Sequence, residues 1–142
     1  MSVVRRGEDK QITFTLVDDS GVDINLATAY TGIICILVTD DREILARYSR
    51  EAYTDVNGNV FDVADFAQSN QTTNTGEFVI RLQRDITSVA PLVKFKWEIK
   101  VQAADADYDS STFDTLAIVD SDSTNVRFEF KDAVSKNDQN YA

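Results

Sequence analysis

The sequence contains no histidine, one cysteine and one proline. Without histidine the chain has no imidazole to act as a general base, a proton shuttle or a zinc ligand. The single cysteine, Cys35, excludes an internal disulfide and a thiolate cluster for zinc or iron–sulfur. Cys35 lies in the most apolar run of the chain, so we expect a buried, unreactive thiol. We therefore expect a protein that is not an enzyme and uses no cofactor.

The chain is also poor in positive charge, with 14 Lys and Arg residues against 24 Asp and Glu residues and a net charge of −10. Nucleic acids and anionic membranes bind basic surfaces, so we expect neither as a partner. No apolar run approaches the roughly 20 residues of a membrane span. No apolar stretch follows the first residues as it would in a signal peptide, and we expect assembly in a reducing cytoplasm.

The residues that are abundant favour β-structure. Asp outnumbers Glu by 18 to 6, and Val and Ile together number 25 against seven Leu. Asp favours turns, and β-branched residues favour strands. The length of 142 residues is that of one domain. We expect an amino-terminal arm (residues 1–10), a β-sandwich domain (residues 11–134) and a polar tail (residues 135–142).

Short runs of alternating apolar and polar residues follow one another along the chain. In residues 11–18, Ile12, Phe14 and Leu16 alternate with polar residues, as in a strand with one buried face. Residues 30–38 are apolar at their centre, which predicts a strand buried on both faces. Further runs at residues 43–49, 77–83, 92–102, 112–119 and 125–131 complete the pattern. It predicts an all-β fold, an immunoglobulin-like β-sandwich of about seven strands.

Two of these runs carry further detail. The Thr-Asp-Asp-Arg sequence at residues 39–42 predicts a hairpin turn, after which Ile44, Ala46 and Tyr48 share one side of a strand. In residues 92–102, Trp97 lies on the apolar side of a strand whose other side carries Lys and Glu. We expect Trp97 to anchor the core.

Residues 50–76 are the least regular part. Asp55-Val56-Asn57-Gly58-Asn59 is a strong turn signal. Residues 60–67 are compatible with a short helix, because Val60, Phe61, Val63 and Phe66 would form an apolar side. A connection of this length in a compact domain has either a binding role or a small structure of its own.

Asp105, Asp107 and Asp109 alternate as in the first half of a calcium-binding loop. An EF-hand loop needs Gly at its sixth place and Glu at its twelfth. Ser110 and Leu116 occupy those places here, so the motif fails. We expect no metal site; these three aspartates are a weak calcium candidate, and a solvated turn is the simpler interpretation.

Two other sets of side chains bear on chemistry. Asp62 and Asp65 are candidates for a catalytic carboxylate pair, although nothing distinguishes them from residues at a helix start. Tyr48, Tyr53 and Tyr108 are candidates for stacking on sugar rings, although packing is the commoner role. A carbohydrate-binding module that uses residues 54–75 and these tyrosines, with or without calcium, is the alternative hypothesis for function. A small acidic hydrolase is a third.

Charge is distributed unevenly along the chain. Residues 101–125 contain six acids and no base. Bases gather near the amino terminus, and again at Arg81, Arg84, Lys94, Lys96 and Lys100. In a repeated assembly, a basic arm of one subunit can meet an acidic loop of the next. The residues we expect at such subunit interfaces are Arg5, Arg6, Lys10, Asp105, Asp107, Asp109 and Tyr141.

The order of several short motifs resembles that of immunoglobulin-like domains in virion proteins of tailed bacteriophages. The nearest example is the amino-terminal domain of baseplate upper proteins. The matching stretches are Arg6-Gly7-Glu8-Asp9, a strand, the turn Asp18-Asp19-Ser20-Gly21, the step Asp23-Ile24-Asn25-Leu26, and later Phe78-Val79-Ile80-Arg81-Leu82, Arg84-Asp85-Ile86-Thr87 and Phe95-Lys96-Trp97-Glu98-Ile99. The sequence departs from the family at Pro91-Leu92-Val93 and at the acidic loop around Asp107.

The resemblance implies a structural protein of a virion and no catalytic residues. The baseplate domain heads a longer chain, whereas this sequence holds one domain. It therefore looks more like a capsid auxiliary or decoration subunit, or a tail or baseplate adaptor, present in many copies. The expected partners are other virion proteins and copies of itself.

Overall fold

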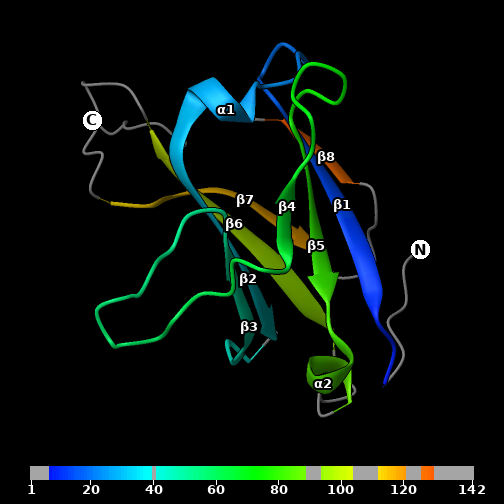
Figure 1. Ribbon diagram of the computed structural model, residues 1–142, viewed down its shortest axis with the longest axis vertical. Coiled ribbons are helices and arrows are strands. Elements are labelled where there is room, and N and C mark those ends of the chain that lie inside the picture. The colour runs from blue at the N-terminus through cyan, green and yellow to red at the C-terminus, as the bar shows by residue number, and fades with distance from the viewer. Residues whose placement is uncertain (1–6, 40, 89–93, 104–111, 121–125, 130–142) are drawn as a thin grey trace.

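The chain folds into two β-sheets that pack face to face (Figure 1). A computed structural model of residues 1–142 describes residues 7–39, 41–88, 94–103, 112–120 and 126–129. The first sheet has the order β4 (Phe66–Gln68), β5 (Glu77–Leu82), β1 (Lys10–Val17) and β8 (Val126–Glu129). The second has the order β3 (Ile44–Ser49), β2 (Tyr30–Thr39), β6 (Phe95–Ala103) and β7 (Asp114–Asp120). The predicted all-β sandwich is confirmed.

The strand order is that of an immunoglobulin domain with one edge changed. Immunoglobulin sheets have the orders A-B-E-D and C′-C-F-G. Strands β1 to β7 follow the order B, C, C′, D, E, F and G along the chain, with every pairing among them antiparallel. The place of strand A is taken by β8, which pairs parallel to β1 from Phe14↔Val126 to Val17↔Glu129. Both ends of the domain therefore meet in the first sheet.

The main core fills the space between the sheets. Because strand side chains alternate, every second residue of each strand points inward. Phe14 of β1 stacks on Phe78 of β5 at 5.1 Å between ring centroids, and meets Trp97 of β6 edge-on at 5.7 Å. Each large apolar side chain that leaves water stabilises the fold by about 1.5–3 kcal/mol. The predicted role of Trp97 as a core anchor is confirmed, since it is fully buried.

Strand β2 is buried on both faces, as predicted. Ile33, Cys35 and Leu37 point into the main core. Ile34 and Ile36 point to the outer face of the second sheet, where a separate small apolar cluster covers them. The residues of that cluster that come from outside β2 are Phe61, Tyr53 and Phe113.

The expected short helix at residues 60–67 is wrong. Asp62 accepts hydrogen bonds from the amides of Ala64, at 2.8 Å, and Asp65, at 3.3 Å, so its side chain closes a turn in place of a helical one. The four residues expected to form one apolar side of that helix do not share an environment, because Phe61 and Phe66 are buried while Val60 and Val63 are exposed.

Two four-residue helices are found elsewhere. Helix α1 (Leu26–Ala29) begins at Asn25, whose side chain accepts from the Ala27 amide and caps the first turn. Helix α2 (Arg84–Thr87) follows directly after β5 and Gln83. Thr87 is buried there, and its hydroxyl donates to the Glu8 carbonyl at 2.8 Å. This bond ties the helix to the residues that lead into β1.

Candidate functional site

The outer face of the second sheet is divided into a covered part and an open part. Residues 50–65, here named the covering segment, leave the end of β3, form a turn of their own and lead into β4. Their aromatic residues pack over β2: Tyr53 meets Phe61 edge-on at 5.0 Å and Phe113 at 4.9 Å. The open part continues along the same face, past Ile36.

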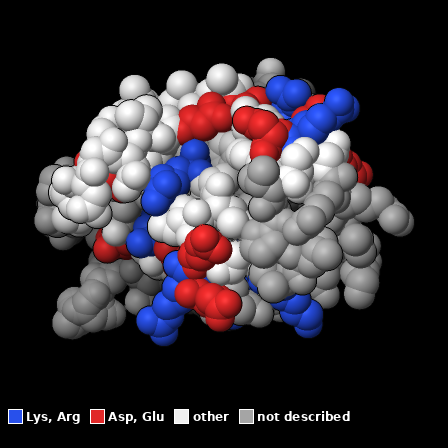
Figure 2. Space-filling view, turned by 90° about the horizontal axis from the view of Figure 1, so that it is seen from below, with Lys and Arg blue, Asp and Glu red and all other residues white. Residues whose placement is uncertain are grey.

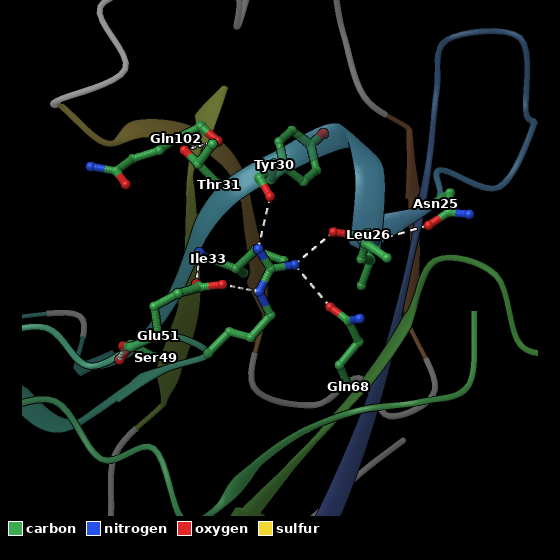
Figure 3. Close-up of polar contacts among 11 residues, drawn as sticks. Asn25, Leu26, Tyr30, Thr31, Ile33, Ser49, Glu51, Gln68 and Gln102 are labelled. Carbon is green, nitrogen blue, oxygen red and sulfur yellow. Dashed lines mark hydrogen bonds and ion pairs between the residues drawn. The ribbon is translucent and has the colours of Figure 1, made fainter. Parts of the chain in front are cut away.

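Arg50 fixes the start of the covering segment (Figure 3). Its guanidinium donates to the Leu26 carbonyl at 2.6 Å, the Tyr30 carbonyl at 2.8 Å and the Gln68 side-chain oxygen at 2.8 Å. It also forms an ion pair with Glu51, whose other carboxylate oxygen accepts from the Ile33 amide at 3.2 Å. A buried cation needs such a full set of acceptors. Arg50 therefore joins the end of β3 to α1 and β4, and its donors are used within the fold.

The covering segment projects from the sandwich as a turn at residues 54–60, here named the valine turn (Figure 1). The amide of Asp55 donates to the Asn59 carbonyl at 3.0 Å, and the Asp55 carboxylate accepts from the amides of Asn57 and Asn59 at 3.0 and 2.9 Å. The backbone and side-chain hydrogen bonds from Asn59 lower the pKa of Asp55. These bonds hold the turn in one shape, and that shape leaves Val56 99% exposed.

The open part of the face is a depression with a volume of about 710 Å³, here named the outer-sheet groove. Its apolar residues come from three strands: Ile36 and Val38 of β2, Ile44 of β3 and Ile118 of β7. Ile44 is 40% exposed and Ile118 is 59% exposed. Apolar side chains so exposed and gathered in one depression mark a candidate interaction surface.

The groove also carries more positive than negative charge, on a chain that is acidic as a whole. Arg42, Lys96 and Lys100 line it, against the single acid Glu98. Within the described residues only Lys100 of these three cations has an ion-pair partner, Glu98 at 3.4 Å. Figure 2 views the end of the molecule that carries α2 and the β2–β3 turn; acidic and basic side chains lie close together there, without a continuous field of one sign.

Arg42 occupies an unusual backbone position in the β2–β3 turn. Its φ is +68°, in the left-handed region that favours glycine. The turn is held by the Arg42 amide, which donates to the Thr39 carbonyl at 2.9 Å, and by the Glu43 amide, which donates to the Thr39 hydroxyl at 3.0 Å. Residues held in such a conformation cluster at functional sites, so Arg42 is a candidate contact residue of the groove.

The candidate carboxylate pair is brought together, at the edge of the sandwich. The Gln83 amide nitrogen donates to Asp62, at 3.2 Å, and to Asp65. Arg81 lies 3.5 Å from both Asp65 and Asp9. Burial and the neighbouring Asp62 raise the pKa of Asp65. The amide and the guanidinium occupy the carboxylate oxygens, so the arrangement is a polar cluster that ties β5 to the covering segment.

Two polar atoms in the core have no hydrogen-bond partner among the described residues: the Tyr48 hydroxyl and the Trp97 ring nitrogen. The two rings pack together at 6.2 Å between centroids. Burial and the nearby Asp62 raise the pKa of Tyr48. Burial also raises the pKa of the Cys35 thiol, as the sequence predicted.

Of the three tyrosines predicted to bind sugars, the two that the structure describes do not form a platform. Tyr48 is completely buried, which corrects its candidacy as an exposed residue. Tyr53 is half-buried, and its ring packs against Phe61 and Phe113. Tyr108 lies outside the described residues.

Of the residues predicted at subunit interfaces, only Lys10 is described. It is the first residue of β1 and lies opposite Leu82 of β5. The others lie outside the described residues: Arg5, Arg6, Asp105, Asp107, Asp109 and Tyr141.

The second predicted basic group is divided between the two sheets. Arg81 lies on β5 and pairs with carboxylates, whereas Lys96 and Lys100 lie in the outer-sheet groove. The sequence did not indicate that Ile44 and Ile118 would line the groove, because their exposure depends on strand register.

In the described part of the chain, no helix is long and apolar enough to cross a membrane. The same residues contain no group of three or more Cys, Asp or Glu side chains placed to hold a metal ion.

Comparisons of the chain with protein-family models, with curated proteins and with solved structures find no match.

Proposed function

We propose that this chain is a non-enzymatic structural protein of a tailed-phage virion, which binds neighbouring subunits through its loops and termini. The observation that carries the proposal is the valine turn. A loop held in one shape by its own hydrogen bonds, with Val56 99% exposed at its tip, presents an apolar contact already ordered before binding. Such preorganisation lowers the entropic cost of association.

The virion role is supported by the order of motifs that resembles phage immunoglobulin-like domains, and by the sandwich order of strands B to G. An immunoglobulin-like sandwich hosts many functions, so the fold itself supports the role only by analogy. A capsid auxiliary subunit and a tail or baseplate adaptor would both use such contacts. Carbohydrate binding is less well supported, because Tyr48 is buried and the Tyr53 ring is packed between two phenylalanines.

Mass spectrometry of purified particles tests the proposal. Particles would be produced from the genome that encodes the chain and separated from free protein by density. The expected result is this protein at many copies per particle, retained through a second purification. Its absence from particles that contain the other structural proteins would contradict the proposal.

Calorimetry with soluble glycans, with and without calcium, tests the alternative on the purified chain. The structural role predicts no saturable heat. Clear saturable binding would favour the carbohydrate-binding module instead.

A further inference from the structure

We propose that the partner of this outer face is a second copy of the same chain, with the valine turn of each copy seated in the outer-sheet groove of the other. The proposal rests on the structural role proposed above and names one of its contacts. Three independent features of the described residues support it.

The first feature is apolar complementarity. The valine turn exposes Val56 and Val60, at 99% and 76%. The groove exposes Ile44 and Ile118, above a floor that includes Val38. Protein-binding surfaces bury apolar side chains at their centre within a charged rim. Contact between the two surfaces would cover the most exposed large apolar side chains of this face at once.

The second feature is charge complementarity. The valine turn carries one acid, Asp55, and no Lys or Arg. The other acids of the covering segment, Glu51, Asp62 and Asp65, bind groups within the fold. The groove has the opposite balance, with three cations against one acid. Opposite charges around an apolar contact steer association and fix its register. A turn whose single charge is negative and a groove whose net charge is positive lie on the same chain, which favours a copy of that chain as the occupant.

The third feature is position. Ile36 packs against Phe61 of the covering segment and also lines the groove, so the two surfaces adjoin on one face of the second sheet. A two-fold axis through that face would let each turn reach the other groove, because a two-fold interface joins each patch to its counterpart on the other copy.

Cysteine cross-linking between two variants tests the contact directly. Val56→Cys and Ile118→Cys are exposed positions, and the native Cys35 is buried, so the introduced thiols are the accessible ones. The two variants are mixed at equal concentration and oxidised. The expected product is a disulfide-linked heterodimer, confirmed by peptide mass spectrometry. The matched control mixes Val22→Cys with Ile118→Cys, because Val22 is 60% exposed but lies in neither surface.

A heterodimer that is no more abundant than in the Val22 control would overturn the proposal, and so would linkage of Val56→Cys only to itself. Sedimentation velocity supplies a second measurement on folded full-length protein. We expect Lys96→Glu to weaken dimerisation by about tenfold or more, since it reverses a groove charge. Lys94→Glu, two residues away and outside the groove, should leave the dimer unchanged. A wild-type chain that stays monomeric at millimolar concentration, or equal effects of the two reversals, would also overturn it.

The outcome is separable from that of the proposed function. If particles contain the chain in many copies but the cross-link does not form, the structural role stands and the turn has a different partner. If the cross-link forms but particles lack the chain, the self-contact stands and the virion role fails.

Discussion

Asp65 lies beside Asp62 where the covering segment meets β5, and the Gln83 side chain donates to both carboxylates. The Asp65 side chain is only 10% exposed. Burial, followed by the neighbouring Asp62, raises the pKa of Asp65, although Arg81 partly opposes this. A carboxyl group that is buried beside another carboxylate holds its own proton more tightly.

Asp65→Asn should stabilise the protein at neutral pH, by up to about 1 kcal/mol. The substitution removes a buried charge and keeps an oxygen to accept from Gln83. Because the folded state holds the Asp65 proton more tightly than the unfolded state, ionised Asp65 costs stability above its raised pKa. The advantage of the variant should therefore shrink as the pH falls through that pKa. Urea unfolding at several pH values measures it. A constant difference at all pH values would contradict the account, and Asp19→Asn, in an exposed turn, is the control.

Arg50→Ala should destabilise the fold by about 2–4 kcal/mol. The guanidinium donates to the carbonyls of Leu26 and Tyr30, which would lose a donor in a half-buried region. Arg50→Lys should recover only part of the loss, because one ammonium group cannot match the guanidinium fork. Chemical unfolding compares these variants with Arg84→Ala, whose side chain is exposed on α2. Similar losses for Arg50→Ala and Arg84→Ala would show that the network contributes little.

Gly76→Ala and Gly58→Ala separate steric clash from backbone strain. Both glycines have φ of +83°. A Cβ at Gly76 would lie 2.6 Å from the Leu16 carbonyl oxygen, whereas a Cβ at Gly58 meets nothing within 4 Å. We expect a loss of about 1 kcal/mol at Gly58 and more than about 3 kcal/mol at Gly76. Thermal unfolding measures both. Equal losses of stability in the two variants would mean that the backbone near Leu16 moves to accommodate the new Cβ at little cost.

The strands were predictable because their pattern is local. Alternation in β1 and the continuous apolar run of β2 each reflect which faces are buried, and both predictions are confirmed. Helix α1 was missed because it is only four residues long and depends on a single cap, Asn25. The helix expected at residues 60–67 failed because the Asp62 side chain competes for the backbone amides that a helix would use.

The groove could not be predicted because register decides which side chains face it. The sequence placed Ile44 on the same side as Ala46 and Tyr48, which are buried. A shift in register opposite Leu37 and Val38 changes this, so Ile44 faces outward instead. Ile118 lies beyond a similar shift between β6 and β7. Such irregularities depend on the pairing of distant strands, and alternation within one strand does not reveal them.

Arg42→Gly should make the protein more stable and less able to associate. The left-handed backbone at φ +68° costs an arginine about 1 kcal/mol relative to glycine, less the greater entropy of glycine in the unfolded chain. We therefore expect a gain of up to about 0.5 kcal/mol in urea unfolding.

The same change removes one of the three groove cations, so the dimer should weaken in sedimentation velocity. Arg42→Asn separates the two effects further, because asparagine tolerates the left-handed region but carries no charge. It should match Arg42→Gly in association while gaining less stability. If Arg42→Gly leaves association unchanged, Arg42 is not part of the contact; if it lowers stability, the turn depends on the arginine side chain. If Arg42 occupies this strained position because its side chain makes the contact, Arg42→Gly should raise the stability of the protein and weaken its association at the same time.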